Sequence, residues 1–124
     1  MVGVERVFED IDYVRPFLHE VSNIVGKRWN FRILWEMRNQ KKIRYNELLY
    51  SLHGISPSTL SEVLKHLQKE SLIRRVAHGT APPLKVEYNI TQKGLDLIVA
   101  SSSLIKWTMK ERKHISQIPL KNHN

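Results

Sequence analysis

Small hydroxyl side chains and a lysine gather near the middle of this 124-residue chain. They are Ser56, Ser58, Thr59, Ser61 and Lys65. Hydroxyl groups donate and accept hydrogen bonds at close range, and a lysine ammonium can reach a guanine edge or a phosphate. At the start and on the exposed face of a helix, such a set suits contacts with DNA bases and their backbone. For Ser56 alone, a structural role as the helix cap is favoured.

Glu62 belongs to the same stretch and is awkward for this chemistry. A carboxylate facing DNA repels phosphates unless it accepts a hydrogen bond from a cytosine amino group. It could equally pair with His66 or Lys65, and both interpretations stay open. Glu62, His66 and Glu70 also recur at four-residue steps, a spacing that could hold a metal ion. No further ligand is positioned with them, so a solvated helix face is favoured, and we expect neither a metal nor a cofactor.

A second group of candidate DNA contacts is basic. It comprises Arg74, Arg75, His78 and Lys85, which flank a loop with glycine and Pro-Pro, and Lys27, Arg28 and Arg44, which precede expected helices. Their cations could follow a minor groove or a phosphate ridge. Two alternatives remain: one of the two adjacent arginines could pair across a hairpin with Glu87, and any single cation could simply be solvated.

The elements that must position these side chains are two short helices joined by a tight turn. Tyr45, Leu48, Leu49 and Leu52 share one helical face, and Leu60, Val63, Leu64 and Leu67 share another. Gly54 suits the end of the first helix, while Ser56 and Pro57 suit the cap and first position of the second. The pattern predicts a helix-turn-helix whose second helix can enter a DNA major groove.

A β-hairpin is expected directly after the second helix. Residues 72–90 contain two β-prone runs around the glycine and Pro-Pro loop. In the second run Leu84, Val86, Tyr88 and Ile90 alternate at period two. Ile43 and Arg44 are expected to form a short strand that pairs with this hairpin. A hairpin in this position is a wing, so the fold class is mainly α with a small β-hairpin wing.

Three segments resemble the HxlR-type winged-helix regulators, a family related to the MarR group. They are VGKRWNFRIL (25–34), RYNELLYSLHGISPSTLSEVLKHLQ (44–68) and PPLKVEYNITQKG (82–94). The resemblance spans roughly residues 17–113 and implies a cytoplasmic, homodimeric DNA-binding regulator of nearby promoters, more often a repressor than an activator. Many members resemble sensors of reactive electrophiles that use a cysteine near the N-terminus. This chain has no cysteine, which excludes thiol-based sensing in it.

The charge is concentrated on the helix-turn-helix and the wing. The whole chain carries +8, the net charge of residues 27–85 alone is also +8, and residues 1–26 are net negative. Such an excess would neutralise phosphates and release counterions, although a basic face kept for solubility is the alternative. No apolar run approaches membrane-spanning length, and the N-terminus is not that of a signal peptide, so a soluble cytoplasmic protein without a membrane partner is expected.

The terminal segments are predicted to mediate dimerisation. Residues 1–16 read as an N-terminal arm that Pro16 breaks, and Phe17, Leu18, Val21, Ile24 and Val25 read as a first core helix. After the winged domain (17–91), a helix capped by Thr91 is expected over 92–113 and a flexible tail over 114–124. The candidate interface residues are Val7, Phe8, Ile11, Leu95, Ile98, Leu104, Ile105, Trp107 and Met109. Folding of this helix back over its own domain is the alternative.

These features predict a non-enzymatic, homodimeric regulator that binds double-stranded DNA at a two-fold symmetric operator. The competing class is a winged-helix module that binds a protein of a transcription or chromatin assembly. The six histidines are scattered, and neither a catalytic elbow nor a glycine-rich phosphate loop is present in the sequence. A small-molecule effector is expected as a further partner, but the sequence names neither this ligand nor the operator.

Overall fold

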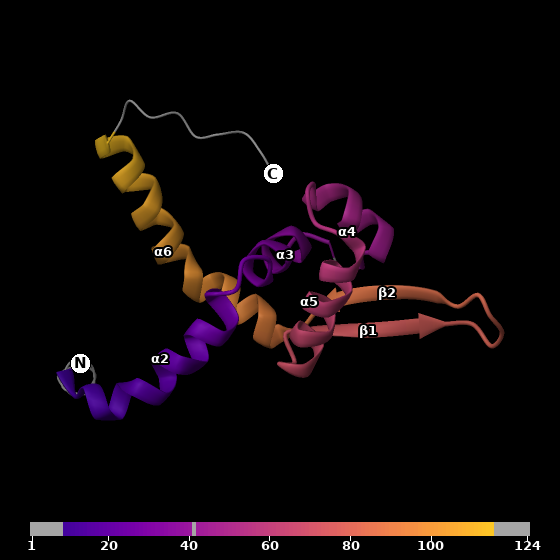
Figure 1. Cartoon of the computed structure of the whole chain (residues 1–124), viewed down its shortest axis with the longest axis horizontal. Coiled ribbons are helices and arrows are strands. Elements are labelled where there is room, and N and C mark those ends of the chain that lie inside the picture. Colours follow the sequence, from indigo (N-terminus) through magenta and orange to yellow (C-terminus); the bar gives the residue numbers. More distant parts are fainter. Residues whose placement is uncertain (1–8, 41, 116–124) are drawn as a thin grey trace. The chain divides into compact units, whose positions relative to one another are not determined.

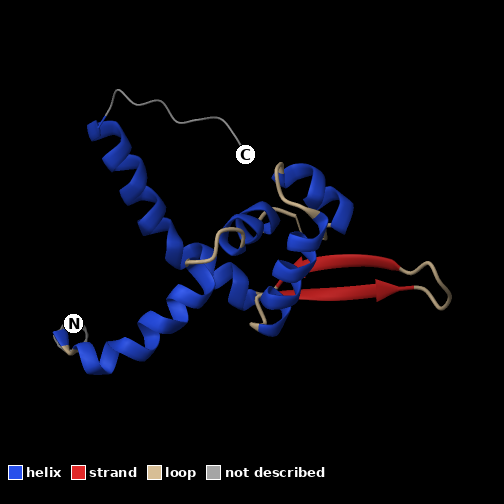
Figure 2. Ribbon diagram, in the orientation of Figure 1, coloured by secondary structure: helices blue, strands red, loops and turns tan. Residues whose placement is uncertain are grey.

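The computed structural model describes residues 9–40 and 42–115. Its elements, in chain order, are α2 (Ile11–Val25), α3 (Asn30–Met37), α4 (Tyr45–Leu52), α5 (Pro57–Lys69), β1 (Ile73–His78), β2 (Lys85–Ile90) and α6 (Gln92–Ile115). Figures 1 and 2 show these helices and the single hairpin. The chain divides into two compact units, residues 1–31 and 32–124. The predicted mainly α fold with a β-hairpin is confirmed.

In the first unit, α2 begins earlier than the sequence predicts and runs through Pro16. The Asp10 carboxylate caps it by accepting from the backbone N–H groups of Asp12 (3.0 Å) and Tyr13 (3.3 Å). Asp12 also forms a salt bridge with Arg15 at 2.8 Å. A proline inside a helix removes one backbone donor, and here the flanking turns continue despite that loss. The prediction that Pro16 breaks the N-terminal helix is therefore wrong, and the expected boundary between 16 and 17 falls inside α2.

The prediction that α2 is a core helix is also wrong. None of its residues is buried, and Phe17, Leu18 and Val21 are about half exposed. Helical spacing of apolar residues shows that a face will be covered, but it does not say by what. Ile11, an expected interface residue, is likewise exposed. Val7 and Phe8 lie outside the described residues.

The core of the second unit is built from the predicted apolar stripes. On α4 the buried side chains are Leu48 and Leu52, and on α5 they are Leu60, Leu64 and Leu67. α3 contributes Ile33, Leu34 and Met37, all completely buried. Full burial of one such side chain stabilises a fold by about 1.5–3 kcal/mol. α4 ends as predicted, because His53 and Gly54 both adopt positive φ.

The hairpin pairs β1 with β2 antiparallel, from Ile73 opposite Ile90 to His78 opposite Lys85. The predicted pairing of this segment with the hairpin is confirmed for Ile43 alone, which exchanges backbone hydrogen bonds of 3.0 and 2.8 Å with Tyr88, whereas Arg44 is the N-cap residue of α4. The helix α5 packs against β1, while α4 and α6 contact β2. The two strands extend beyond the helices as an arm (Figure 1). A helix-turn-helix is thus followed by a wing.

The last helix, α6, begins as predicted, with the Thr91 hydroxyl accepting from Gly94 N–H at 3.1 Å. It continues to Ile115, slightly beyond the predicted end. Ile98 and Ser101 are buried, whereas Leu104, Trp107 and Met109 are more than half exposed. No helix in the described part of the chain is both long and apolar enough to cross a membrane.

Candidate nucleic-acid interface

The hydroxyl cluster forms the first turn of α5. The Ser56 oxygen accepts from Thr59 N–H at 3.2 Å and its hydroxyl donates to Thr59 Oγ1 at 2.9 Å, while Ser58 Oγ lies 3.3 Å away. Pro57 occupies the first helical position, where its missing N–H costs nothing. The predicted capping role of Ser56 is therefore present. Ser58 is exposed beside it, so its hydroxyl can still meet a ligand.

Beyond this turn, the outward face of α5 carries the polar side chains that the sequence predicts. Ser58, Glu62, Lys65 and Lys69 are exposed, while Thr59, Ser61 and His66 are partly covered. Among the described residues Glu62 forms no salt bridge, so the alternative in which it pairs with Lys65 or His66 is not the one formed. Glu62, His66 and Glu70 do not form a metal-binding cluster within the described ranges. The exposed face is thus a mixed hydroxyl, carboxylate and ammonium surface.

Tyr45 is a residue of this region that sequence reasoning placed only in the core stripe. Its hydroxyl donates to the Pro57 carbonyl at 2.7 Å and lies 3.3 Å from Ser61 Oγ. The bond joins the first residue of α4 to the first turn of α5. A tyrosine among leucines was the available signal, because its partly buried hydroxyl needs a partner. Ser61 consequently faces α4 as well as the surface.

The opposite end of α5 is enclosed by backbone bonds and by α6. Leu72 N–H donates to Leu67 O and Ser71 N–H to Gln68 O, both at 2.9 Å, with Ser71 at φ 62°. This is the Schellman arrangement, with serine in the left-handed position usually held by glycine. From α6, Lys93 Nζ donates to Glu70 O, and the Thr91 hydroxyl donates to Ser71 O, each at 2.7 Å.

The wing places its basic residues on two different faces. Directly opposed residues share a face, so Arg74, His78 and Lys85 lie with Asn89 and Glu87. Arg75 lies instead with Tyr88 and Val86, on the face that includes Ile73 and Ile90. Arg74 and Arg75 are both exposed. Adjacent in sequence, they project in opposite directions.

The alternative in which an arginine pairs with Glu87 is not what the structure shows. Glu87 Oε1 lies 2.8 Å from His78 Nε2. Arg74 and His78 both share the polar face with Glu87, and each is two positions from Val76, the residue opposite Glu87. Glu87 pairs with His78, and Arg75 lies on the other face of the wing. His78, a candidate DNA contact, is therefore engaged within the hairpin, while its side chain keeps about half of its surface exposed.

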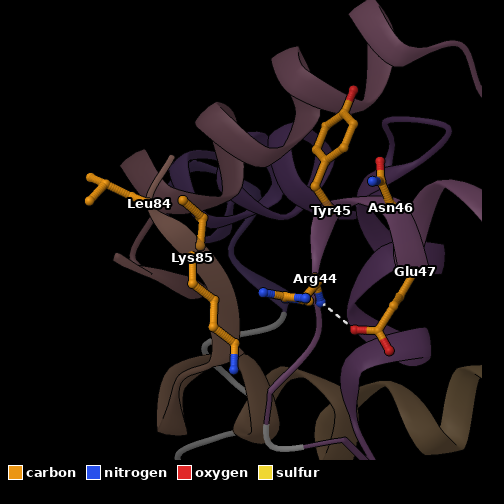
Figure 3. Close-up of a pocket in the computed structure, with 7 residues that line it drawn as sticks. Arg44, Tyr45, Asn46, Glu47, Leu84 and Lys85 are labelled. Atoms are coloured by element: carbon orange, nitrogen blue, oxygen red, sulfur yellow. Dashed lines mark hydrogen bonds between the residues drawn. The ribbon is translucent and has the colours of Figure 1, made fainter. Parts of the chain in front are cut away.

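Arg44 and Lys85 extend into one open groove between the start of α4 and the start of β2 (Figure 3). The groove encloses about 430 Å³ and is also lined by Glu47 and Leu84. Glu47 Oε1 accepts from Arg44 N–H at 2.8 Å and so caps α4. Two cations and a helix N-terminus stand against the one carboxylate of Glu47, so the groove keeps a net positive charge, which favours an anion such as a phosphate.

The remaining predicted contacts, Lys27 and Arg28, lie in the first unit between α2 and α3. Both are exposed. Arg28 places its guanidinium carbon 5.1 Å from the centre of the Trp29 ring, a cation–π arrangement. Stacking holds Arg28 against the aromatic face without consuming its hydrogen-bond donors.

Comparisons with known proteins agree with this architecture. Residues 24–116 match the family described as HxlR-like helix-turn-helix. YdzF of Bacillus subtilis, an HTH-type transcriptional regulator, is 38% identical over 98 residues, which cover 77% of this chain and 86% of YdzF. A MarR-family transcriptional regulator from Enterococcus faecalis V583 superposes with a TM-score of 0.72 at 25% identity, covering 84% of this chain and 93% of that one. Quinone-bound YodB of B. subtilis gives 0.66 at 25% identity, covering 77% and 98%.

A helix-turn-helix with an exposed polar face, followed by a basic wing, defines the class of winged-helix DNA-binding transcription regulators. This protein is such a regulator. Within that class, the chain belongs to the HxlR-like helix-turn-helix family. The resemblance seen in its sequence is confirmed.

Proposed function

We propose that this regulator binds a two-fold symmetric operator in double-stranded DNA as a homodimer and represses transcription by occupying the promoter. The observation that carries the proposal is the outward face of α5. Ser58 and Lys65 are exposed there on a helix whose inner face is fixed in the core. Inserted with its N-terminus leading, α5 would bring both side chains to base edges, and Glu62 would accept from a cytosine amino group.

Backbone phosphates would be held around that helix. The cationic groove of Arg44 and Lys85 supplies one contact, and Arg74 on the polar face of the wing supplies another. Lys27 and Arg28 would add contacts from the first unit. Phosphate contacts fix the register of a protein on DNA, while base contacts supply specificity. The basic excess of residues 27–85 supports this division of labour.

Selection of bound duplexes from a random pool, followed by footprinting, tests the DNA part. We expect an inverted repeat with half-sites about 34 Å apart, or a multiple of this. Affinity should fall steeply as salt is raised, because counterions are released on binding. A module that binds only other proteins would enrich no duplex and would show little salt dependence, which would reject the proposal in favour of that class.

The homodimer is supported by apolar side chains that the chain leaves uncovered. On α2 these are Ile11, Phe17, Leu18 and Val21, and on α6 they are Val99, Leu104, Trp107 and Met109. Contiguous exposed apolar patches mark association surfaces. Leu95 and Ile105 are half-buried and could join such an interface. Ile98 is buried within the chain and is left out of the proposed contact.

Met109→Glu, with the exposed neighbour Lys110→Glu as matched control, tests the homodimer by sedimentation equilibrium. A carboxylate at position 109 must lose hydration or keep the subunits apart, and desolvation costs several kcal/mol. Met109→Glu should therefore be monomeric at concentrations where wild type and Lys110→Glu are dimers. Circular dichroism verifies that the variant is folded. A monomeric wild type, or a dimeric folded Met109→Glu, would exclude this interface.

We also propose that an effector, a small molecule, binds this chain reversibly. The support is indirect: a structural relative, YodB, has been solved with a quinone bound, and this chain has no cysteine to form a thiol adduct. Release of the operator by such an effector should be reversed by dialysis and unaffected by thiol reductants. Persistence of the effect after dialysis would point to covalent modification.

A further inference from the structure

The first turn of the recognition helix α5 is tied to α4 by one phenolic hydroxyl. Tyr45 donates to Pro57 O at 2.7 Å, and its oxygen lies 3.3 Å from Ser61 Oγ. Pro57 and Ser61 stand four positions apart, on successive turns of the same helix face. In Figure 3 the Tyr45 ring extends away from Arg44 and Glu47 toward the neighbouring helix. The hydroxyl therefore bridges two turns of α5 from one fixed point on α4.

That point lies immediately beside the side chains that would read bases. Ser58 follows Pro57, and Lys65 is one turn beyond Ser61. Apolar packing of Leu60 and Leu64 holds α5 against the core, but such contacts are non-directional. A hydrogen bond weakens steeply with misalignment, so it resists rotation of the helix about its own axis. Rotation is the movement that would misdirect Ser58 and Lys65.

We propose that Tyr45 is a positioning residue for operator recognition: its hydroxyl fixes the rotation of α5 so that Ser58 and Lys65 meet their base edges. The inference rests on the proposed operator function. Tyr45 itself touches no base. Its effect is on the discrimination between operator and random DNA, because random duplexes are held mainly through phosphates.

The same geometry assigns a new role to Ser61. Its side chain is partly covered and lies within hydrogen-bond distance of Tyr45. Ser61 is therefore a partner of the tyrosine hydroxyl, in place of the DNA contact that its helix position predicts. The Pro57 carbonyl is the closer acceptor, so Ser61→Ala should reproduce only a fraction of the effect of removing the hydroxyl.

Tyr45→Phe removes that hydroxyl alone, and Tyr50→Phe is the matched control. Tyr50 is on the same helix, but 80% of its surface is exposed. We expect Tyr45→Phe to lower operator affinity about fivefold, corresponding to about 1 kcal/mol, with random-duplex affinity unchanged. Tyr50→Phe should leave both affinities unchanged. In the free protein, hydrogen exchange at the amides of residues 59–61 should accelerate in Tyr45→Phe and stay constant at residues 67–69.

Several results would overturn the proposal. Equal losses on operator and random DNA would make Tyr45 a general stability residue. Faster hydrogen exchange in Tyr45→Phe without any loss of operator preference would show that the first turn of α5 can become more mobile without affecting recognition. Loss of operator preference in Ser61→Ala as large as in Ser58→Ala would return Ser61 to the DNA contacts. A wild type without operator preference would reject the operator itself, whereas a wild-type preference retained by Tyr45→Phe would reject only the positioning role.

Discussion

The two ends of α5, the proposed recognition helix, are held in different ways. At the N-terminal end, the cap of Ser56 and the hydroxyl of Tyr45 act from exposed or half-exposed positions. At the C-terminal end, two backbone bonds close the helix. Thr91, just before α6, and Lys93, within α6, donate to the carbonyls of Ser71 and Glu70. The end that would meet DNA thus depends on a few removable side-chain bonds. The other end is closed by backbone bonds in addition to the side-chain bonds of Thr91 and Lys93.

This difference separates stability from recognition along a single helix. Changes at the C-terminal end should unfold the domain before they alter its preference among DNA sequences. Changes at the N-terminal end should alter that preference while the domain stays folded. Substitutions at one end of α5, or in the strand that continues from it, can therefore be compared with substitutions at the other end.

The largest effect is expected from Gly94→Ala, at the C-terminal side. A Cβ at position 94 would lie 2.5 Å from Leu72 O and 2.6 Å from Ile90 Cγ1. Backbone cannot yield easily, so we expect a loss of about 3 kcal/mol in the free energy of unfolding, in the range of overpacked cores. Urea denaturation followed by circular dichroism measures it. The remaining folded protein should keep its ratio of operator to random-DNA affinity.

Ser103→Ala is the control for this variant, because Ser103 is an exposed residue of the same helix. It should be nearly neutral. Unchanged stability in Gly94→Ala would mean that α6 can move away from the end of α5. If Gly94→Ala kept its stability but lost its preference for the operator, the C-terminal end of α5 would serve recognition, which is the reverse of the proposal.

Ser58→Ala and Lys65→Ala are expected to act in the opposite sense. Each removes an exposed side chain from the outward face of α5, so the free energy of unfolding should change by no more than about 0.5 kcal/mol. Operator binding should weaken by about 1–3 kcal/mol if the side chain reads a base edge. Binding to random duplexes, measured by fluorescence anisotropy in the same buffer, should change much less. Equal losses on both kinds of DNA would restrict these residues to backbone contacts.

The sequence predicts the N-terminal end of α5 better than the C-terminal end. Ser56 and Pro57 predict the start of a helix, because serine is favoured at the N-cap and proline at the first helical position. Ser71 gives no such signal, because the left-handed position it occupies favours glycine or asparagine. The contacts of Thr91 and Lys93 with the end of α5 span about twenty residues. Local spacing cannot foresee them.

The same limit explains the mistakes elsewhere. The hairpin composition identified the wing, but the register places Arg74 and His78 at equal offsets from Glu87, so local spacing cannot show that His78 is its partner. Apolar spacing located α2, yet it could not show that none of the residues of this helix is buried. Pro16 was given too much weight, since a proline costs one backbone hydrogen bond that neighbouring turns can offset. Tyr45 was assigned to the apolar stripe of α4 because of its ring, whereas the hydrogen bond of its hydroxyl to Pro57 O defines its role.

The smallest effect is expected in β1, the strand that continues from the C-terminal end of α5. Arg74 shares the polar face with His78 and Lys85, whereas Arg75 lies on the face of Tyr88 and Val86. If phosphates approach the more basic face, Arg74→Gln should reduce the slope of log affinity against log salt by roughly 0.9, the value for one phosphate contact. Arg75→Gln should leave the slope unchanged, which makes it the matched control.

Salt titrations of both variants on one random duplex decide between the faces of the wing. Neither substitution should change operator preference, because phosphate contacts carry no direct sequence information. Equal slopes for the two variants, both reduced, would mean that the wing inserts with both faces against DNA, as a minor-groove wedge would. A reduced slope for Arg75→Gln alone would place the DNA on the Tyr88 side.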